Sequence, residues 1–201
     1  MSRIVAFTSV TLDGVMQAPG RPDEDTRGGF EHGGWAAPYS DEAMGKVSAE
    51  SMAETGALLF GRRTYEDFYG FWPNQQDNPF TDVLNDARKF VASRSLEEPL
   101  PWQNSAILAG DAADAVAKLK KEPGKDIVIL GSGELIRSLL SRRLIDRFVL
   151  LIHPLVLGTG RRLFGDDGSN VELRLMETKT TPKGVVIATY ETQDQTAAPK
   201  T

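Results

Sequence analysis

Apolar and polar positions along this chain change period several times, which indicates that strands and helices alternate. Residues 3–11 are apolar and β-branched and end in the turn sequence Thr-Leu-Asp-Gly, so they predict a first strand. Short apolar runs predict further strands at residues 56–61, 88–95, 105–110, 126–133 and 145–158. Helical segments are predicted at residues 40–55, 63–71, 78–87, 111–122 and 134–143. The alternation predicts an α/β fold with a mostly parallel central sheet and helices on both faces.

Two segments depart from this alternation. Residues 170–193 alternate around Thr-Pro-Lys-Gly and predict a terminal β-hairpin, which would add antiparallel strands at one edge of the sheet. Residues 17–34 are rich in glycine, proline and charge and predict a long loop, of a length that is usually functional or disordered. Because no repeat or linker divides the chain, we expect one domain over residues 1–193 and a flexible tail over 194–201.

Composition narrows the classes of function. The chain has 201 residues and a formal net charge of −5, whereas nucleic-acid-binding domains usually carry a basic excess, so we expect no nucleic-acid partner. It contains no cysteine, which excludes disulfides, zinc thiolates, iron–sulfur clusters and thiol nucleophiles. Only two histidines are present, His32 and His153, and we expect no metal site.

The apolar runs also bear on where the protein works. The N-terminal segment is interrupted by Asp13 and lacks a small-residue cleavage site, so it predicts a strand and not a signal peptide. The longest apolar run, residues 148–158, is far too short to span a membrane and contains His153 and Pro154. We therefore expect a cytoplasmic protein without a membrane partner.

The strongest chemical signal is the ending shared by three strands. The stretches Leu-Leu-Phe-Gly-Arg-Arg-Thr, Phe-Val-Ala-Ser-Arg-Ser and Val-Ile-Leu-Gly-Ser-Gly each end an apolar strand with small or basic residues. Ligands of open α/β sheets bind at the carboxyl ends of the strands, where glycine lets the backbone approach and a helix N-terminus attracts anions. Arginine adds planar recognition of phosphate. Together the three corners predict a site for a cofactor with several phosphates.

Each corner taken alone has a simpler explanation. Gly131 and Gly133 also fit a tight strand-to-helix turn without a ligand, and Arg62 fits a solvated helix start. Ser93 and Arg94 fit an ordinary loop after a strand. The last corner is not a dinucleotide fingerprint, because the third glycine position holds Ile136.

The same motifs resemble those of the dihydrofolate reductase-like superfamily. Gly-Arg-Arg-Thr-Tyr-Glu at residues 61–66, Val-Ala-Ser-Arg-Ser at 91–95 and Gly-Ser-Gly-Glu-Leu-Ile at 131–136 match its three corners in order and approximate spacing. The sequences at residues 9–16 and 151–164 are more similar to the reductase domain of riboflavin-biosynthesis proteins, the RibD C-terminal family, in its stand-alone form. The resemblance covers residues 3–191 and implies a three-layer α/β/α fold with a sheet of about eight strands.

The resemblance implies a particular cofactor and its contacts. It implies NADPH, with Arg62 and Thr64 on the phosphates and with Ser93 and Arg94 on the adenosine 2′-phosphate. The full set of implied cofactor residues is Ser9, Met16, Gly61, Arg62, Thr64, Ser93, Arg94, Gly131, Ser132, Gly133, Glu134 and Leu135.

Hydride transfer also needs a proton donor, and a carboxyl with a raised pKa can supply it. The sequence offers Asp41 and Glu42 at the predicted helix start, where acids more often act as cap and first-turn residues. The riboflavin-type pattern favours Asp13, which equally fits a turn residue. Candidate substrate contacts are His153, Arg161, which could bind a substrate phosphate, and the loop tryptophans Trp35 and Trp72.

These features predict an NADPH-dependent oxidoreductase that acts on a small heterocyclic substrate. The resemblance favours 5-amino-6-(5-phosphoribosylamino)uracil as that substrate, with a dihydrofolate or pterin reductase as the alternative. A binding protein that retains the nucleotide without turnover, a sensor, is the alternative from another class. By resemblance we expect a homodimer.

Overall fold

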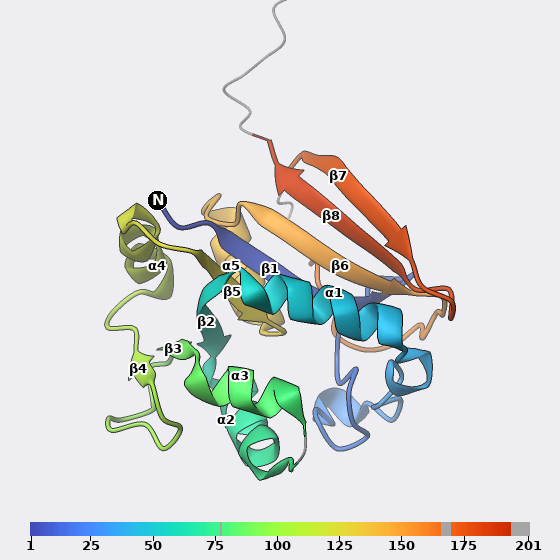
Figure 1. Cartoon of the computed structure of the whole chain (residues 1–201), viewed down its shortest axis with the longest axis horizontal. Coiled ribbons are helices and arrows are strands. Elements are labelled where there is room, and N and C mark those ends of the chain that lie inside the picture. The colour runs from blue at the N-terminus through green and yellow to red at the C-terminus, as the bar shows by residue number, and fades with distance from the viewer. Residues whose placement is uncertain (77, 166–169, 194–201) are drawn as a thin grey trace, which may run out of the picture.

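The sheet is built from the predicted apolar runs (Figure 1). In the computed structural model, which describes residues 1–76, 78–165 and 170–193, the strands follow the order β4-β3-β2-β5-β1-β6-β8-β7. Their bounds are β1 (Ile4–Thr11), β2 (Thr55–Gly61), β3 (Arg88–Ala92), β4 (Ser105–Ile107), β5 (Asp126–Leu130), β6 (Arg147–His153), β7 (Leu173–Thr180) and β8 (Val186–Thr192). The strands from β4 to β6 are parallel, and β8 and β7 pair antiparallel at one edge. The predicted fold class and hairpin are confirmed, and the tail expected over 194–201 lies outside the described residues.

Successive side chains of the central strands point alternately to the two faces of the sheet, which explains why the fold has a layer on each face. On β5, Ile127 and Ile129 point into one apolar core, while Val128 and Leu130 point into another. The same alternation holds on β2, where Leu59 belongs to the first core and its neighbours to the second. Because both faces of these strands are apolar, both must be covered by helices.

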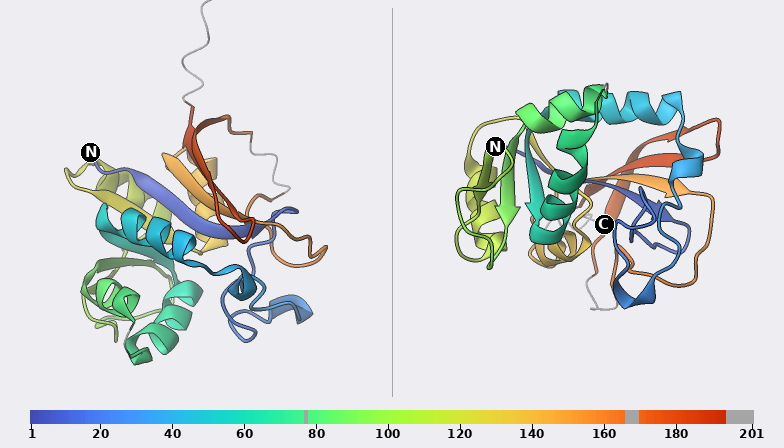
Figure 2. Two further views of the ribbon diagram at one scale, coloured as in Figure 1. Left: turned by 45° about the vertical axis from the view of Figure 1, so that its right-hand side comes forward. Right: turned by 90° about the horizontal axis from the view of Figure 1, so that it is seen from below.

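Helices cover both faces of the sheet, the first three on one face and the last two on the other (Figure 2). Their bounds are α1 (Glu42–Ala53), α2 (Arg62–Phe71), α3 (Pro79–Asp86), α4 (Ala112–Lys121) and α5 (Gly133–Ser141). Met52, Tyr65 and Leu84 bring the first three helices onto one core, and Val116 and Leu139 bring the last two onto the other. Short 3-10 turns lie at Arg27–Gly29, Ala37–Tyr39 and Trp72–Asn74.

One predicted strand is shorter than its apolar pattern. The run of residues 145–158 predicts a strand beyond Pro154, but β6 ends at His153. Proline cannot donate a ladder hydrogen bond, so it stops the strand. The apolar residues that follow have another role: Leu155 and Leu157 pack against a small cluster made by the long loop.

The loop of residues 17–34 shares a small apolar core with the residues that flank it. Val15, Ala18, Phe30 and Trp35 are buried together, and the segment after β6 packs against them. A single polar side chain, that of Gln17, ties the two segments: its amide nitrogen donates to the carbonyls of Asp25 (3.0 Å) and Arg27 (2.9 Å), and its oxygen accepts from the Arg161 N–H (2.9 Å). The loop is therefore held at the carboxyl edge of the sheet.

Two glycines in the segment after β6 test how closely it packs on this loop. Gly158 and Gly160 both have positive φ, so alanine at either one should cost about 1 kcal/mol in backbone strain. A Cβ at Gly158 meets nothing within 4 Å, whereas one at Gly160 would lie 2.7 Å from Phe30 and 2.8 Å from Val15. We expect Gly160→Ala to lower the free energy of unfolding by about 1–3 kcal/mol more than Gly158→Ala, as measured by urea titration. Equal losses would show that the two segments do not pack as described.

Candidate active site

Two adjoining cavities open at the carboxyl edge of the sheet. The loop-side cavity, of about 550 Å³, lies between β1, the loop of residues 16–27 and α2. The edge-side cavity, of about 610 Å³, lies at the ends of β2 and β3 and the start of α4. The residues that line both cavities are Arg27, Arg63, Thr64, Ser132, Gly133 and Glu134. The three predicted corners therefore meet in one continuous groove.

Two of the helix N-termini at this groove, those of α2 and α5, are capped differently from the N-terminus of α4, which also lies there, and from those of α1 and α3. The helices α1, α3 and α4 are capped by the side chains of Asp41, Asn78 and Asp111. The N-cap residues of α2 and α5, Gly61 and Ser132, provide no side-chain cap. The first N–H groups of a helix have no partner within the helix, so these two termini present donors and a positive dipole end to the groove.

The hydroxyl of Ser132 makes a different bond. Its Oγ accepts the Gly61 N–H at 3.0 Å, which ties the β2–α2 corner to the β5–α5 corner. The turn before α5 has positive φ at Gly131 and at Ser132 itself. A Cβ on Gly133 would lie 2.5 Å from the Met16 sulfur, so the segment that follows β1 packs closely against the start of α5.

The corner at the end of β3 supplies a cation. Arg94 lines the edge-side cavity and forms no hydrogen bond or ion pair with any residue that the structure describes. The Ser93 hydroxyl accepts from the N–H groups of Ser95 (3.2 Å) and Leu96 (2.9 Å), which shapes the turn. Arg62 lies at the same cavity and pairs with Glu66 one helical turn later, at 2.9 Å.

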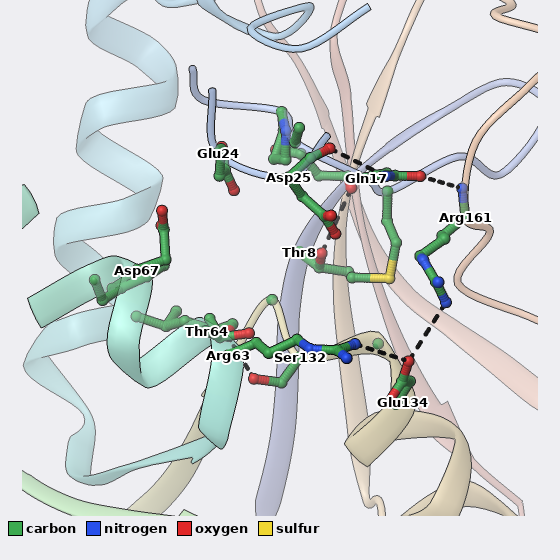
Figure 3. Close-up of a pocket in the computed structure, with 18 of the residues that line it drawn as sticks. Thr8, Gln17, Glu24, Asp25, Arg63, Thr64, Asp67, Ser132, Glu134 and Arg161 are labelled. Atoms are coloured by element: carbon green, nitrogen blue, oxygen red, sulfur yellow. Dashed lines mark hydrogen bonds and ion pairs between the residues drawn. The ribbon is translucent and has the colours of Figure 1, made fainter. Parts of the chain in front are cut away.

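Where the cavities join, one carboxylate faces three arginines, two of which, Arg63 and Arg161, are labelled beside it in Figure 3. Glu134 lies within 3.4 Å of Arg161, 3.6 Å of Arg27 and 3.8 Å of Arg63. All four side chains are at least one-third exposed, so each pair contributes little to stability. The cluster brings together arginines from the long loop, from α2 and from the segment after β6.

The loop-side cavity contains two carboxyls that the sequence did not point to. Burial raises the pKa of Glu24, and the nearby charge of Asp67 raises it further. Burial also raises the pKa of Asp67, although Arg21 opposes this through an ion pair. Glu24 enters the cavity from the long loop and Asp67 from α2, as Figure 3 shows. Asp67 could have been suspected, because it lies one helical turn after Thr64; Glu24 lies in a loop without any periodic signal.

All twelve predicted cofactor residues line this groove. Those lining the loop-side cavity are Ser9, Met16, Thr64, Gly131, Ser132, Gly133 and Glu134. Those lining the edge-side cavity are Gly61, Arg62, Thr64, Ser93, Arg94, Ser132, Gly133, Glu134 and Leu135. Arg161 and Trp72 also line the loop-side cavity.

The carboxyls proposed from sequence as proton donors have other positions. Asp13 lines neither cavity within the described chain: it accepts from the Thr11 hydroxyl (2.6 Å) and from the N–H groups of Leu157 (3.2 Å) and Gly158 (2.9 Å). These bonds, led by that of Thr11, lower the pKa of Asp13 to about 2.

Asp41 and Glu42 also lie away from both cavities. Asp41 accepts the Met44 N–H at 2.9 Å as the N-cap of α1, which lowers its pKa, and Glu42 occupies the first turn of that helix. The structure therefore gives both residues the capping and first-turn positions that the sequence offered as their simpler explanation.

Two predicted substrate contacts are likewise not among the described residues lining the cavities. Trp35 is buried in the loop cluster and donates to the Gln17 carbonyl at 2.7 Å. His153 is fully buried at the end of β6, edge-on to Trp35 at 5.1 Å, and burial lowers its pKa. Trp35 therefore belongs to the loop cluster, and His153 packs against it.

The described residues give no sign of two other kinds of site. They contain no group of three or more His, Asp or Glu side chains that could hold a metal ion. None of the helices among them has the length and apolar composition needed to cross a membrane.

A parallel sheet extended by an antiparallel hairpin, with a groove at its carboxyl edge, defines a dihydrofolate reductase-like fold. The structure matches dihydrofolate reductase from Enterococcus faecalis complexed with NADP(H) (TM-score 0.61, 14% identity, 96% of this chain and 97% of that one). It also matches a protein of Shewanella sp. PV-4 attributed to riboflavin biosynthesis (TM-score 0.68, 20% identity, 96% and 99%).

The sequence comparison then gives the family. Residues 2–187 match the RibD C-terminal domain, and the chain belongs to this reductase-like family. YyaP of Bacillus subtilis is 33% identical over 195 residues, which cover 94% of each chain. The predicted family is confirmed.

The position of Asp13 makes a prediction about acid stability. Its pKa in the folded protein, about 2, is below the usual 3.8, so the unfolded chain takes up the proton first as the pH falls. The carboxylate therefore contributes its full stabilisation above pH 4, and loses it as the pH falls towards 2. We expect Asp13→Asn to lower the melting temperature at pH 7 but to differ little from the unchanged protein near pH 2. An equal difference at both pH values would show that the charge of Asp13 has no part in holding the segment after β6.

Proposed function

We propose that this protein is an NADPH-dependent reductase that transfers hydride to a small heterocyclic substrate. The observation that carries the proposal is the pair of helix N-termini without a side-chain cap, those of α2 and α5, at one groove that also contains Arg94, which has no partner among the described residues. Helix N-termini bind phosphate through their free N–H groups and dipole, and three anion-binding elements suit a cofactor with three phosphates.

The residues of the edge-side cavity fit such a dinucleotide. The N-termini of α2 and α5 would hold the diphosphate, with Thr64 and Ser132 adding hydroxyl groups. Gly133 supports this fit, because it keeps the backbone open where Met16 approaches. Arg94 would take the 2′-phosphate through its planar guanidinium, which is the contact that separates NADPH from NADH.

The loop-side cavity fits the reacting end. Ser9 and Met16 lie on its wall, where the resemblance implies contact with the nicotinamide side of the cofactor. When bound, NADPH supplies the hydride that an electrophilic carbon of the substrate accepts, and a proton must reach the neighbouring heteroatom. The loop of residues 17–34, held by Gln17, lines one side of this cavity and would help to exclude water from it. Glu24 and Asp67, whose pKa values are raised, are better suited to carry that proton than Asp13.

We further propose that the protein acts in the cytoplasm as a homodimer. On the edge strand β7, Leu175 and Met176 are about half exposed, and burial of such side chains favours association. The riboflavin-type substrate, a phosphorylated ribosylaminopyrimidine, remains one candidate within the heterocyclic class, and a pterin is the other.

Substitution of Arg94 tests the assignment of the 2′-phosphate. We expect Arg94→Ala to weaken NADPH binding about tenfold or more, because a charged hydrogen bond is lost, and to change NADH binding little. The affinities can be measured by isothermal titration calorimetry. Arg142→Ala is a matched control, since Arg142 is exposed and pairs with Asp114. Equal losses for the two cofactors would remove Arg94 from the 2′-phosphate site.

Turnover separates a reductase from a sensor. We expect the protein to oxidise NADPH, followed by the loss of its near-ultraviolet absorbance, with at least one member of a panel of dihydropterins and ribosylaminopyrimidine phosphates. Arg94→Ala should raise the KM for NADPH without abolishing the reaction at saturating cofactor. Tight NADPH binding without turnover on any substrate of the panel would favour the sensor.

A further inference from the structure

One oxygen atom marks the point where three segments of the chain bring arginines together. The Oε1 atom of Glu134 lies 3.4 Å from Arg161, 3.6 Å from Arg27 and 3.8 Å from Arg63. In Figure 3 the side chains of Arg63 and Arg161 reach it from opposite sides. Charge-assisted hydrogen bonds are usually about 2.7–2.9 Å long, so none of the three contacts is a short charged bond. The glutamate therefore engages these cations loosely.

Arg27, which comes from the long loop, has a donor without a partner. Its Nε atom donates to Asp25 at 2.7 Å, and its Nη2 atom donates to the same carboxylate. Its Nη1 atom is buried and makes no hydrogen bond with any residue that the structure describes. A buried donor of this kind costs free energy unless a ligand or water accepts from it. This N–H group therefore favours a further acceptor beside Glu134.

A single buried side chain connects Arg27 with Arg161. Gln17, only 4% exposed, donates to the Arg27 carbonyl at 2.9 Å and accepts the Arg161 N–H at 2.9 Å. This bridge joins the backbone of the long loop to that of the segment after β6. Both guanidinium groups then lie near the same oxygen of Glu134. The two arginines are thus placed to bind one anion together.

The junction of the two cavities brings this cluster to the helix N-termini that lack a side-chain cap. The junction is defined by the six residues that line both cavities: Arg27, Arg63, Thr64, Ser132, Gly133 and Glu134. Thr64 lies in the first turn of α2, and Gly133 is the first residue of α5. The arginines and both helix N-termini therefore border the same space.

The charges at the junction leave a positive excess that suits a diphosphate. The three arginines are opposed by two carboxylates, those of Glu134 and Asp25, which leaves one formal positive charge. Each helix N-terminus adds the equivalent of about half a positive charge. The diphosphate of a dinucleotide, with a negative charge on each phosphate, would balance this excess. Because Arg27 and Arg63 line both cavities, their position favours the cofactor over a group that lies in the loop-side cavity alone.

We propose that Arg27 and Arg161 bind the diphosphate of the dinucleotide from the side of the long loop, and that Glu134 competes with the diphosphate for these arginines. The inference rests on the proposed reductase function and adds the residues by which the loop engages the cofactor. The Glu134 side chain is 65% exposed, so it can turn into solvent when a phosphate oxygen takes the place of its Oε1 atom. Cofactor binding would exchange loose contacts for shorter charged hydrogen bonds and would hold the long loop at the groove through Arg27.

Three probes separate this contact from the others at the groove. They are NADPH, adenosine 2′-monophosphate, which has the 2′-phosphate without the diphosphate, and ribose 5-phosphate, which has a phosphate without the adenosine. We expect Arg27→Ala to weaken NADPH binding about tenfold or more, because charged hydrogen bonds are lost, and to leave adenosine 2′-monophosphate unchanged. We expect Glu134→Gln to tighten NADPH binding about threefold or more, because the amide does not compete for the arginines. Isothermal titration calorimetry measures each affinity.

Matched variants control for general effects of charge. Glu42→Gln is the control for Glu134→Gln, because Glu42 also lies in the first turn of a helix but away from both cavities. Arg142→Ala is the control for Arg27→Ala, since Arg142 is exposed and lines neither cavity. Both controls should leave the three affinities unchanged. In a protein that already carries Arg27→Ala, the gain from Glu134→Gln should be smaller, which a general change of charge would not produce.

The loop itself gives a second measurement. We expect saturating NADPH to slow amide hydrogen exchange over residues 20–30 in the unchanged protein and in Arg94→Ala, as followed by mass spectrometry. The slowing should be lost in Arg27→Ala at saturating NADPH, because the cofactor then has no contact through which to hold the loop.

The outcomes distinguish this inference from the proposed function. If Arg27→Ala leaves NADPH affinity unchanged, weakens adenosine 2′-monophosphate equally, or weakens ribose 5-phosphate more than NADPH, the inference is wrong while the reductase proposal stands. The same holds if Glu134→Gln weakens NADPH binding. If the unchanged protein does not bind NADPH, the reductase proposal fails and this inference fails with it.

Discussion

The hydrogen bond from the Gly61 N–H to the Ser132 hydroxyl is the interaction on which the site depends. It joins the corner between β2 and α2 to the corner between β5 and α5, two strands that are neighbours in the sheet. Because the serine oxygen accepts from another strand, it does not cap its own helix, and the N-terminus of α5 stays open. Gly61 has no side chain with which to cap α2. One contact thus fixes the spacing of two helix N-termini that have no side-chain cap.

The other wall of the groove comes from segments that the sheet does not hold. The long loop is attached through the Gln17 side chain, which bonds both to the loop itself and to the segment after β6. Asp13 holds that same segment from its opposite end through Leu157 and Gly158. The proposed hydride transfer would need water excluded, and the loop that lines the cavity is held by a few polar bonds over a small apolar cluster.

The sequence predicted the parts of this molecule that follow from local pattern. The strands, the helices and the three corners could be read from their periods of two and of 3.6 and from glycine and arginine at strand ends, because the parallel arrangement then brings those ends to one edge. The end of β6 was harder to predict, because its apolar run continues past Pro154 into residues that pack against the loop cluster. Glu24 could not be found in this way, because its position depends on the path of an irregular loop. Asp41 and Glu42 are candidate proton donors in the sequence, and only the position of α1 in the structure shows that they lie away from both cavities.

The charges of the groove divide its two ends between two kinds of ligand. At the edge-side cavity, open helix termini and Arg94 favour anions, whereas the loop-side cavity also contains the carboxyls of Glu24 and Asp67. Glu134 lies at the boundary, where it engages arginines from three segments. One carboxylate balances only one of these three positive charges, so the boundary between the cavities stays cationic. A dinucleotide in this groove would meet favourable potential along its phosphates and the carboxyls of Glu24 and Asp67 beyond them, and this difference favours one direction for it.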